Sequence, residues 1–333
     1  MKNQNGSVII IVLWTAVLLT VLVTAMASKV RLSAQTAIHN QDTSISWATI
    51  MGAFNKSEME LMLERMTRPI GEQLEETEEG EFRNPAYRFN GQALDLYYPL
   101  QENITVRIFD HGGKINLNRI PRRNMQLLIE KRLGGQEADP EEVQDLLTAW
   151  TDWTDLNDLE GLNGAEVEYY ESLEQPYTPR NNPELDTVEE IRHIRGFDEL
   201  FEDVNLQAAF TIYGNERTVN LNLATREAME LLPGLDNELI ENIIAYREIE
   251  EINTRAEIAE IVPFEELQEL SPWVGNNNTN FFSVYAYKNI ELGEETLLEI
   301  EQEEFPNFDL VKQAYMEVIE VRGFNDLPNI HRV

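Results

Sequence analysis

A run of apolar residues dominates the start of the chain. It occupies residues 8–27, contains no charged side chain, and follows directly on a short polar leader that ends in Gly6. Twenty residues reach about 30 Å as an α-helix, which is enough to cross the hydrocarbon core of a bilayer. The pattern therefore predicts a membrane anchor.

The helical pattern continues beyond the apolar run. From Val30 to Met66, apolar residues recur at spacings of three and four, which places them on one face of a helix. Pro69 and Gly71 then end the pattern. We expect one continuous N-terminal helix, with its first half in lipid and its second half packed on a folded domain.

A cleaved secretory signal peptide is an alternative interpretation of the same run. The apolar core of a signal peptide usually spans about 7–15 residues before a small-residue cleavage site. The run is longer here, although Ala25 and Ala27 offer such a site. The position of Gly6 and the continuing helical pattern favour the anchor, and cleavage after Ala27 stays open.

The pattern changes beyond Pro69. Residues 72–81 are a charged run that we expect to be a solvated loop. Strands are predicted at residues 97–98 and 104–109, and again near the C-terminus at residues 281–287 and 296–300. The segment between these two groups is mainly helical. Strands at both ends predict an α+β fold in which one β-domain carries a large α-helical insertion.

A short repeat divides the helical segment. Residues 114–118 and residues 218–222 both end in Asn-Leu-Asn, and each precedes an apolar helical stretch. The Asn side chains can tie a turn while the alternating apolar residues point inward. We interpret the repeat as shared architecture without chemistry.

Residues 232–247 resemble a helix-hairpin-helix, a motif that offers backbone N–H groups to DNA phosphate in repair proteins. Asp236, Glu238 and Glu241 crowd the start of the second helix, where a phosphate would have to lie. Acidic side chains favour a helix N-terminus and repel an anion there. We expect a structural or protein-contacting hairpin and no nucleic-acid partner.

Composition agrees with that exclusion. The chain has 60 Asp plus Glu against 26 Lys plus Arg, a net charge of −34, and 42% hydrophobic residues. It has enough apolar material for a core, and its field repels phosphate backbones. Such a charge attracts cations or reflects a saline habitat, two explanations that stay open. The absence of Cys excludes disulfides, thiol catalysis and Cys-ligated zinc.

An acidic loop, residues 152–168, is the densest cluster of hard oxygen donors between aromatic side chains. Calcium takes six to eight oxygen ligands in flexible loops of this kind. An EF-hand is excluded because Leu159 and Glu160 stand at its fifth and sixth positions. A solvated acidic loop without a metal is the alternative. The candidate calcium ligands are Asp155, Asp158 and Glu166, together with Asp152 and Asn157.

Enzyme functions find little support. The four His residues show no His-x-x-x-His spacing, and there is no Gly-x-Ser-x-Gly motif. His111, beside Asp110, is expected to be a solvated turn residue. Acidic pairs are too common in this chain to indicate glycoside hydrolysis. We therefore predict that the protein is not an enzyme, and a hydrolase is the most distant alternative.

The N-terminal helix resembles that of type IV pilins and type II secretion pseudopilins. In that family a prepilin peptidase cuts after the glycine that matches Gly6 and leaves the residue at Ser7 as the new N-terminus. Filament-forming pilins mostly carry glutamate at the fifth mature position, which here is Ile11. An unpaired carboxylate in lipid is costly, so Ile11 suits a subunit with no neighbour above it.

Motifs in the insertion resemble a narrower family, general secretion pathway protein K. They are DWTD at residues 152–155, NGAE at 163–166 and PYTPRNNP at 176–183, with the two Asn-Leu-Asn repeats and the Pro-Gly-Leu hairpin beside them. The resemblance covers nearly the whole chain. It implies a pilin-like fold, in which the long N-terminal helix packs on a small antiparallel sheet, with a SAM-like or helix-hairpin-helix insertion and structural calcium.

The same resemblance implies a function. Protein K is a minor pseudopilin at the tip of the type II secretion pseudopilus, where it nucleates or caps the filament that exports folded proteins across the outer membrane. Its expected partners are minor pseudopilins I and J, other pseudopilins, the prepilin peptidase and the inner-membrane secretion platform. The chain would cross the bacterial inner membrane once and place its globular domain in the periplasm. A type IV minor pilin and a membrane-anchored calcium-dependent adhesin are the alternatives.

These expectations divide the chain into segments. They are the leader at residues 1–6, the transmembrane part of the helix at 7–28, its amphipathic part at 29–68, a pilin-like β region at 69–112, the helical insertion at 113–275 with repeats at 113–215 and 216–275, and a C-terminal β region at 276–333.

Overall fold

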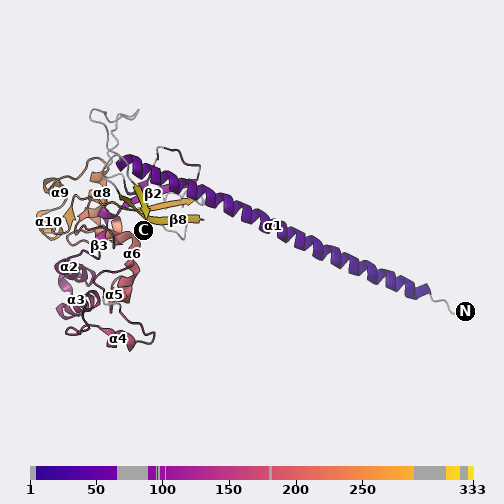
Figure 1. Cartoon of the computed structure of the whole chain (residues 1–333), viewed down its shortest axis with the longest axis horizontal. Coiled ribbons are helices and arrows are strands. Elements are labelled where there is room, and N and C mark those ends of the chain that lie inside the picture. Colours follow the sequence, from indigo (N-terminus) through magenta and orange to yellow (C-terminus); the bar gives the residue numbers. More distant parts are fainter. Residues whose placement is uncertain are drawn as a thin grey trace. The chain divides into compact units, whose positions relative to one another are not determined.

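A computed structural model describes residues 5–65, 89–94, 96, 98–101, 103–179, 182–288, 313–322 and 329–333. It separates into two compact units, Met1–Gly52 and Ala53–Val333. Helix α1 (Asn5–Arg65) is a single helix of 61 residues (Figure 1), as the sequence predicts. Among the predicted elements, the loop at residues 72–81 and the strand at 296–300 lie outside the described residues.

The described part of the first unit is helix α1 as far as Gly52. Among the described residues, α1 is the one helix long and apolar enough to cross a membrane, judged by length and composition. Its apolar side chains are exposed, as at Leu13 and Trp14. A helix that is apolar all round is typical of a segment buried in lipid, so α1 is consistent with a single membrane anchor.

The second unit contains a five-stranded antiparallel sheet with the strand order β1-β2-β7-β8-β9. Strands β2 (Ile104–Asp110) and β7 (Phe281–Lys288) coincide with two predicted strands and pair with Val106 opposite Ala286. Tyr98 lies in a bend, so its predicted place in a strand is wrong. The remaining strands are β1 (Asn90–Ala93), β8 (Gln313–Arg322) and β9 (Asn329–Arg332).

The last turns of α1 pack on this sheet. Phe54 meets Tyr315 of β8 edge to face, with ring centroids 4.9 Å apart. Arg332 of β9 bonds the Glu58 carboxylate at 3.2 Å and lies over the Phe54 ring. The long helix and small antiparallel sheet predicted from the sequence are therefore present.

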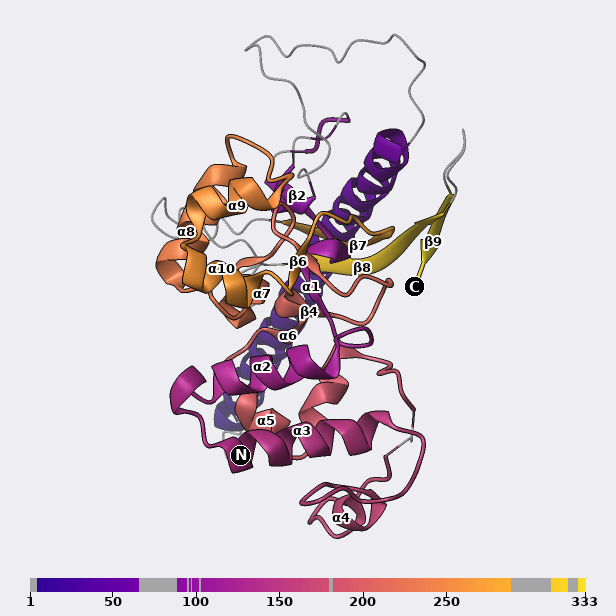
Figure 2. The ribbon, with the colours of Figure 1, turned by 90° about the vertical axis from the view of Figure 1, so that its left-hand side faces the viewer.

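The helical insertion lies between β2 and β7 in the sequence. Figures 1 and 2 show its helices in two groups, with α2, α3 and α5 in one and α8, α9 and α10 in the other. A core of buried apolar side chains, among them Met125, Trp150, Phe197 and Trp273, runs through the insertion. The helices of eight or more residues are α2 (Arg122–Arg132), α3 (Pro140–Thr154) and α8 (Asn237–Arg247).

Short helices complete the insertion. The α-helices are α4 (Val167–Glu171), α5 (Phe197–Leu200), α6 (Leu206–Ala209), α7 (Arg226–Leu231), α9 (Arg255–Ile261) and α10 (Phe264–Leu270). The 3-10 helices are η2 (His111–Gly113), η3 (Gly135–Glu137) and η4 (Val188–His193).

Two parallel strand pairs, absent from the sequence-based prediction, close the two repeats. Strand β3 (Ile115–Asn116) pairs with β4 (Phe210–Thr211), and β5 (Val219–Asn220) pairs with β6 (Val274–Gly275). Each strand has only two residues, too few to give a sequence pattern of period two. In each repeat, one strand precedes the helices and its partner follows them.

Asn side chains tie the repeats by equivalent hydrogen bonds. Asn118 accepts from the Leu185 N–H at 2.8 Å and donates to the Leu185 carbonyl at 3.1 Å. Asn222 accepts from the Ile252 N–H at 2.8 Å and donates to the Ile252 carbonyl at 2.9 Å. The second Asn of each repeat thus pairs like a backbone group, the turn-tying role predicted for it.

His111 contradicts its prediction as a solvated turn residue. It is buried in η2, with Nδ1 2.6 Å from Thr211 Oγ1 and Nε2 2.8 Å from Ser283 Oγ. Burial, and secondarily the charge of Lys114, holds the pKa of His111 well below its usual value. Helix η2 joins the sheet to the insertion. The ring of His111 therefore contacts β7 of the sheet and β4 of the insertion.

A candidate metal centre in the helical insertion

Helix α3 positions the first carboxylate of the candidate centre. Asp139 caps the helix by accepting from the Glu141 N–H, and Pro140 stands in the first turn. At the other end, Asp152 and Trp153 are both buried. The indole of Trp153 donates to Glu190 at 3.1 Å and meets the Tyr170 ring edge to face. This packing fixes the end of α3 from which the acidic loop departs.

The acidic loop folds back around Asp152. The Asp152 carboxylate accepts from the Gly161 N–H at 3.1 Å and from the Ala165 N–H at 3.0 Å. A Cβ at Gly164 would lie 1.8 Å from the Asp152 Oδ2 atom, so only glycine leaves room for this approach. The two backbone donors and the close approach bring the loop into contact with the end of α3.

Three carboxylates meet where the loop closes. Asp152, Asp155 and Glu166 each offer an oxygen within 4.8 Å of the others. Glu166 is 5% exposed, and its Oε1 atom has no hydrogen-bond partner. Burial, and after it the charges of Asp152, Asp155 and Asp158, together raise the pKa of Glu166 to about 7. Without a cation, the three carboxylates therefore repel one another.

This donor set fits a hard cation. Carboxylate oxygens are the ligands that calcium prefers, and an unpaired buried carboxylate oxygen is costly unless a charge or a donor faces it. Asp152, Asp155 and Glu166 would hold the ion. Its chemistry there would be structural, because the positive charge would cancel the repulsion between them. The calcium assignment itself stays a prediction.

The other two candidate ligands lie differently. Asp158 is exposed and lies outside the cluster of three, although its charge acts on Glu166. Asn157 accepts from the Leu159 N–H at 2.9 Å and donates to the Asp155 Oδ2 atom at 2.8 Å. Asn157 therefore orients Asp155, and its own role as a ligand stays a prediction.

Several supporting residues were not identified from the sequence. Arg195 donates to the Gly164 carbonyl at 2.6 Å, and its guanidinium lies over the Tyr169 ring. Asn163 adopts a positive φ of 54° and donates to Asp145 at 3.0 Å. Gly161 and Gly164 in so acidic a loop were a readable signal of close backbone approach. No sequence pattern placed Arg195 there, since it lies beyond α4.

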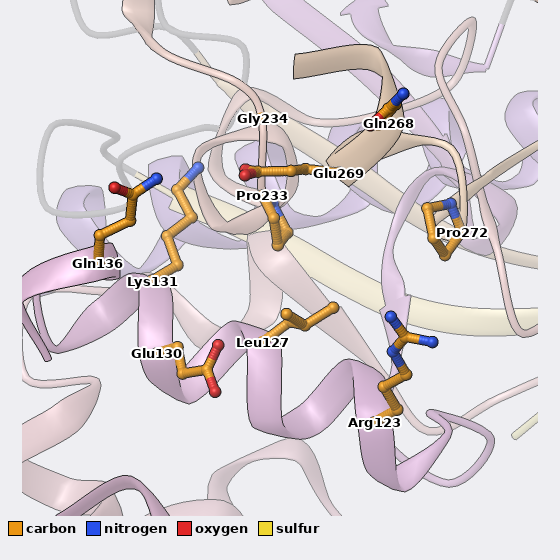
Figure 3. A pocket seen from close by; sticks show the side chains of 11 residues that line it. Arg123, Leu127, Glu130, Lys131, Gln136, Pro233, Gly234, Gln268, Glu269 and Pro272 are labelled. Atoms are coloured by element: carbon orange, nitrogen blue, oxygen red, sulfur yellow. The ribbon is translucent and has the colours of Figure 1, made fainter. Parts of the chain in front are cut away.

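A second feature is a pocket of about 390 Å³ beside the predicted hairpin at residues 232–247, between α2 and α10 (Figure 3). Arg123 and Lys131 line it together with Glu130 and Glu269, so its charges are of both signs. Lys131 donates to the hairpin carbonyls of Leu232 at 2.6 Å and Leu235 at 2.9 Å. Burial lowers the pKa of Lys131 to about 8.

Atoms of the chain itself occupy the space around the hairpin. Gly234 has φ +79°, and a Cβ there would lie 2.3 Å from the Glu266 carbonyl. Asp236 caps α8 by accepting from the Leu239 N–H at 2.8 Å. The helix N-terminus is thus occupied by a carboxylate of the chain, as the sequence predicts, which disfavours a phosphate at that position.

The two candidate processing residues lie in α1. Gly6 and Ser7 belong to its first turns, where the helix begins at Asn5. Processing at this position stays a prediction.

Comparisons with known proteins bear on the insertion and on the fold. Residues 113–204 match the family model described as type II secretion system protein K. The chain also resembles a chain in the crystal structure of the GspK–GspI–GspJ complex from the type 2 secretion system of enterotoxigenic Escherichia coli. That likeness has a TM-score of 0.52 and 12% identity, and it covers 89% of this chain and 97% of that chain. A comparison with curated proteins finds no match.

The matched segment contains the candidate metal centre. It runs from η2 through α5 and includes the whole acidic loop. The resemblance to protein K inferred from the sequence is therefore confirmed. The matched family is a structural component of the secretion system, which supports the prediction that the chain is not an enzyme.

Proposed function

We propose that this chain is the minor pseudopilin that nucleates or caps the tip of a type II secretion pseudopilus, the filament that exports folded proteins across the outer membrane. The observation that carries the proposal is the protein K domain at residues 113–204, inserted into a fold with a long apolar helix and a small antiparallel sheet. The fold's likeness to a chain of the GspK–GspI–GspJ complex supports it.

Membrane placement follows from helix α1. A prepilin peptidase would remove residues 1–6 after Gly6 and leave Ser7 as the N-terminus. The apolar half of the helix would then anchor the chain in the bacterial inner membrane, in contact with the secretion platform. The globular domain would lie in the periplasm.

Two features support the tip over the body of the filament. The insertion adds a second core to the pilin-like sheet, and so large a domain should clash with a copy stacked closely above it. Ile11 replaces the glutamate that would otherwise pair with the amine of a neighbouring subunit. A subunit at the top has no such neighbour.

Calcium is the proposed structural ion of the acidic loop. The unpaired buried oxygen of Glu166 beside Asp152 and Asp155 supports it. We assign the insertion to the SAM-like, helix-hairpin-helix class, with its hairpin serving protein contact. The carboxylate cap at Asp236 supports that role over DNA binding.

The test is assembly with minor pseudopilins I and J, mixed in detergent with the full chain. We expect a defined hetero-complex held through the amphipathic face predicted at residues 30–66, in the part of α1 that the chain's own sheet does not cover. Ile38 is exposed on this helix, so Ile38→Asp should weaken the complex without unfolding the chain. Asn40→Asp adds the same charge two residues away and serves as the control. Failure of the unaltered chain to join I and J would contradict the proposal.

A further inference from the structure

The acidic loop exposes three leucines. Leu156, Leu159 and Leu162 are 75%, 78% and 85% exposed, and they recur every third residue along the loop. Isolated exposed leucines are ordinary on a protein surface, but several within seven consecutive residues form the kind of apolar surface that marks a contact site. The leucines are therefore the feature of this loop that the metal site does not explain.

Side-chain oxygens of the loop accept hydrogen bonds from the loop's own backbone. Asp155 accepts from the Asn157 N–H at 2.9 Å, and Asn157 accepts from the Leu159 N–H at 2.9 Å. Asp152 accepts from the Gly161 N–H. These hydrogen bonds hold the backbone of the loop, while the leucines between them are exposed to solvent. The same segment thus combines a backbone held by Asp and Asn side chains with exposed apolar side chains.

The charge around the leucines indicates what covers them. Asp158, Glu160 and Glu168 are exposed in the same loop. These carboxylates, in a chain of net charge −34, would repel an anionic lipid surface. They would likewise repel a second copy of the same loop. A protein segment with apolar side chains flanked by Lys or Arg fits both the leucines and the carboxylates.

We propose that residues 156–162 are a docking loop for a basic, apolar segment of a partner protein. The inference rests on the proposed calcium site for its regulation. A cation bound by Asp152, Asp155 and Glu166 would fix both ends of the docking loop and so pre-order the leucines for contact. Docking should therefore be stronger in calcium than in chelator.

A synthetic peptide tests the proposal directly. The full chain is placed in phosphatidylcholine nanodiscs, with empty nanodiscs as the blank, and titrated into a fluorescein-labelled peptide of alternating Leu and Lys. Binding is followed by anisotropy in calcium and in chelator. A peptide with Glu in place of Lys, and vesicles of phosphatidylethanolamine and phosphatidylglycerol, represent the other occupants.

Two matched variants isolate the leucines. The test variant carries Leu156→Ser, Leu159→Ser and Leu162→Ser, which leave the charge of the loop unchanged. The control carries Ile249→Ser and Phe264→Ser, two side chains of the insertion that are 84% and 73% exposed. Calcium binding is measured on all three proteins by titration calorimetry.

We expect the unaltered chain and the control to bind the Lys peptide in calcium, and the triple variant to bind it at least ~10-fold more weakly. Equal binding by the triple variant, equal binding of the Glu peptide, or a preference for vesicles would overturn the proposal. If calcium does not bind but the leucines still govern peptide binding, the docking loop stands and the calcium site fails.

Discussion

Glu166 is the residue on which the candidate metal centre depends most. Its carboxylate is buried, one oxygen has no hydrogen-bond partner, and two other carboxylates face it. A buried charge of this kind destabilises the metal-free fold, and a cation reverses the effect. The two states should therefore respond oppositely to loss of the charge.

We predict that Glu166→Gln raises the stability of the chelator-treated protein by about 1–2 kcal/mol and removes most of the stabilisation that calcium gives the unaltered chain. Thermal unfolding at pH 8 by circular dichroism measures both. Glu168→Gln, at an exposed neighbour, removes the same charge and should change neither. A solvated loop without a metal would instead give melting curves that ignore calcium.

Lys131 predicts a pH dependence of stability. Its pKa lies at about 8 in the folded chain, below its ordinary 10.5, because burial disfavours the charge. Between these two values the unfolded chain binds more protons, so the free energy of unfolding rises as pH increases from about 8 to 10.5. Lys131→Met removes this contribution.

The unfolding free energy of the unaltered chain minus that of Lys131→Met should rise by about 1–2 kcal/mol as pH increases over that window, after allowance for partial exposure. Urea unfolding at pH 8 and pH 10 measures it. A difference that stays constant with pH would show that the ammonium group is not buried against the hairpin.

Part of the candidate metal centre could be predicted from the sequence. It identified Asp152, Asp155 and Glu166 by residue type and density, and the structure brings these three together. It also placed Asp158 and Asn157 among the ligands, but density alone does not tell which side chains converge. That depends on the backbone turns fixed by Gly161 and Gly164 and on the carbonyl contact of Arg195.

The hydrogen bonds of Asn118 and Asn222 predict a difference in stability between the two repeats. Asn222 is buried and forms two hydrogen bonds to Ile252, whereas Asn118 makes equivalent bonds to Leu185 while partly exposed. Loss of a buried Asn side chain leaves the backbone groups that it pairs with without a hydrogen-bond partner. Water can replace the lost partner more easily at Asn118.

Asn222→Ala should therefore lower the free energy of unfolding by about 2–4 kcal/mol, and Asn118→Ala by about 1–2 kcal/mol. Urea unfolding of the two variants side by side measures the difference. Equal losses would show that burial does not distinguish the two repeats.

The elements that sequence predicted best are those with sustained periodicity. Helix α1 and strands β2 and β7 follow directly from their apolar patterns. Strand β8 was missed although Ile319 and Val321 alternate with polar residues, so its signal was present. Strands β3 to β6 have two residues each and arise from pairing between distant segments, which no local pattern records. His111 was misjudged for the same reason.

Processing belongs to the whole molecule, because it decides whether α1 stays an anchor. We predict that coexpression with a prepilin peptidase gives an intact mass corresponding to loss of residues 1–6. A bulky substitution such as Gly6→Leu should block the cut, and Gly52→Leu, in the same helix with open space around its backbone, should not. Cleavage after Ala27 would instead indicate a signal peptide and remove the anchor from the mature chain.

If one copy of this chain ends each filament, its position on isolated pseudopili should show it. Filaments carrying a gold-labelled version of the chain would be viewed by electron microscopy, with a label on the repeating subunit as the reference. We predict a single label at one end, because the inserted domain would exclude a copy stacked above it. Labels distributed along the length would contradict it.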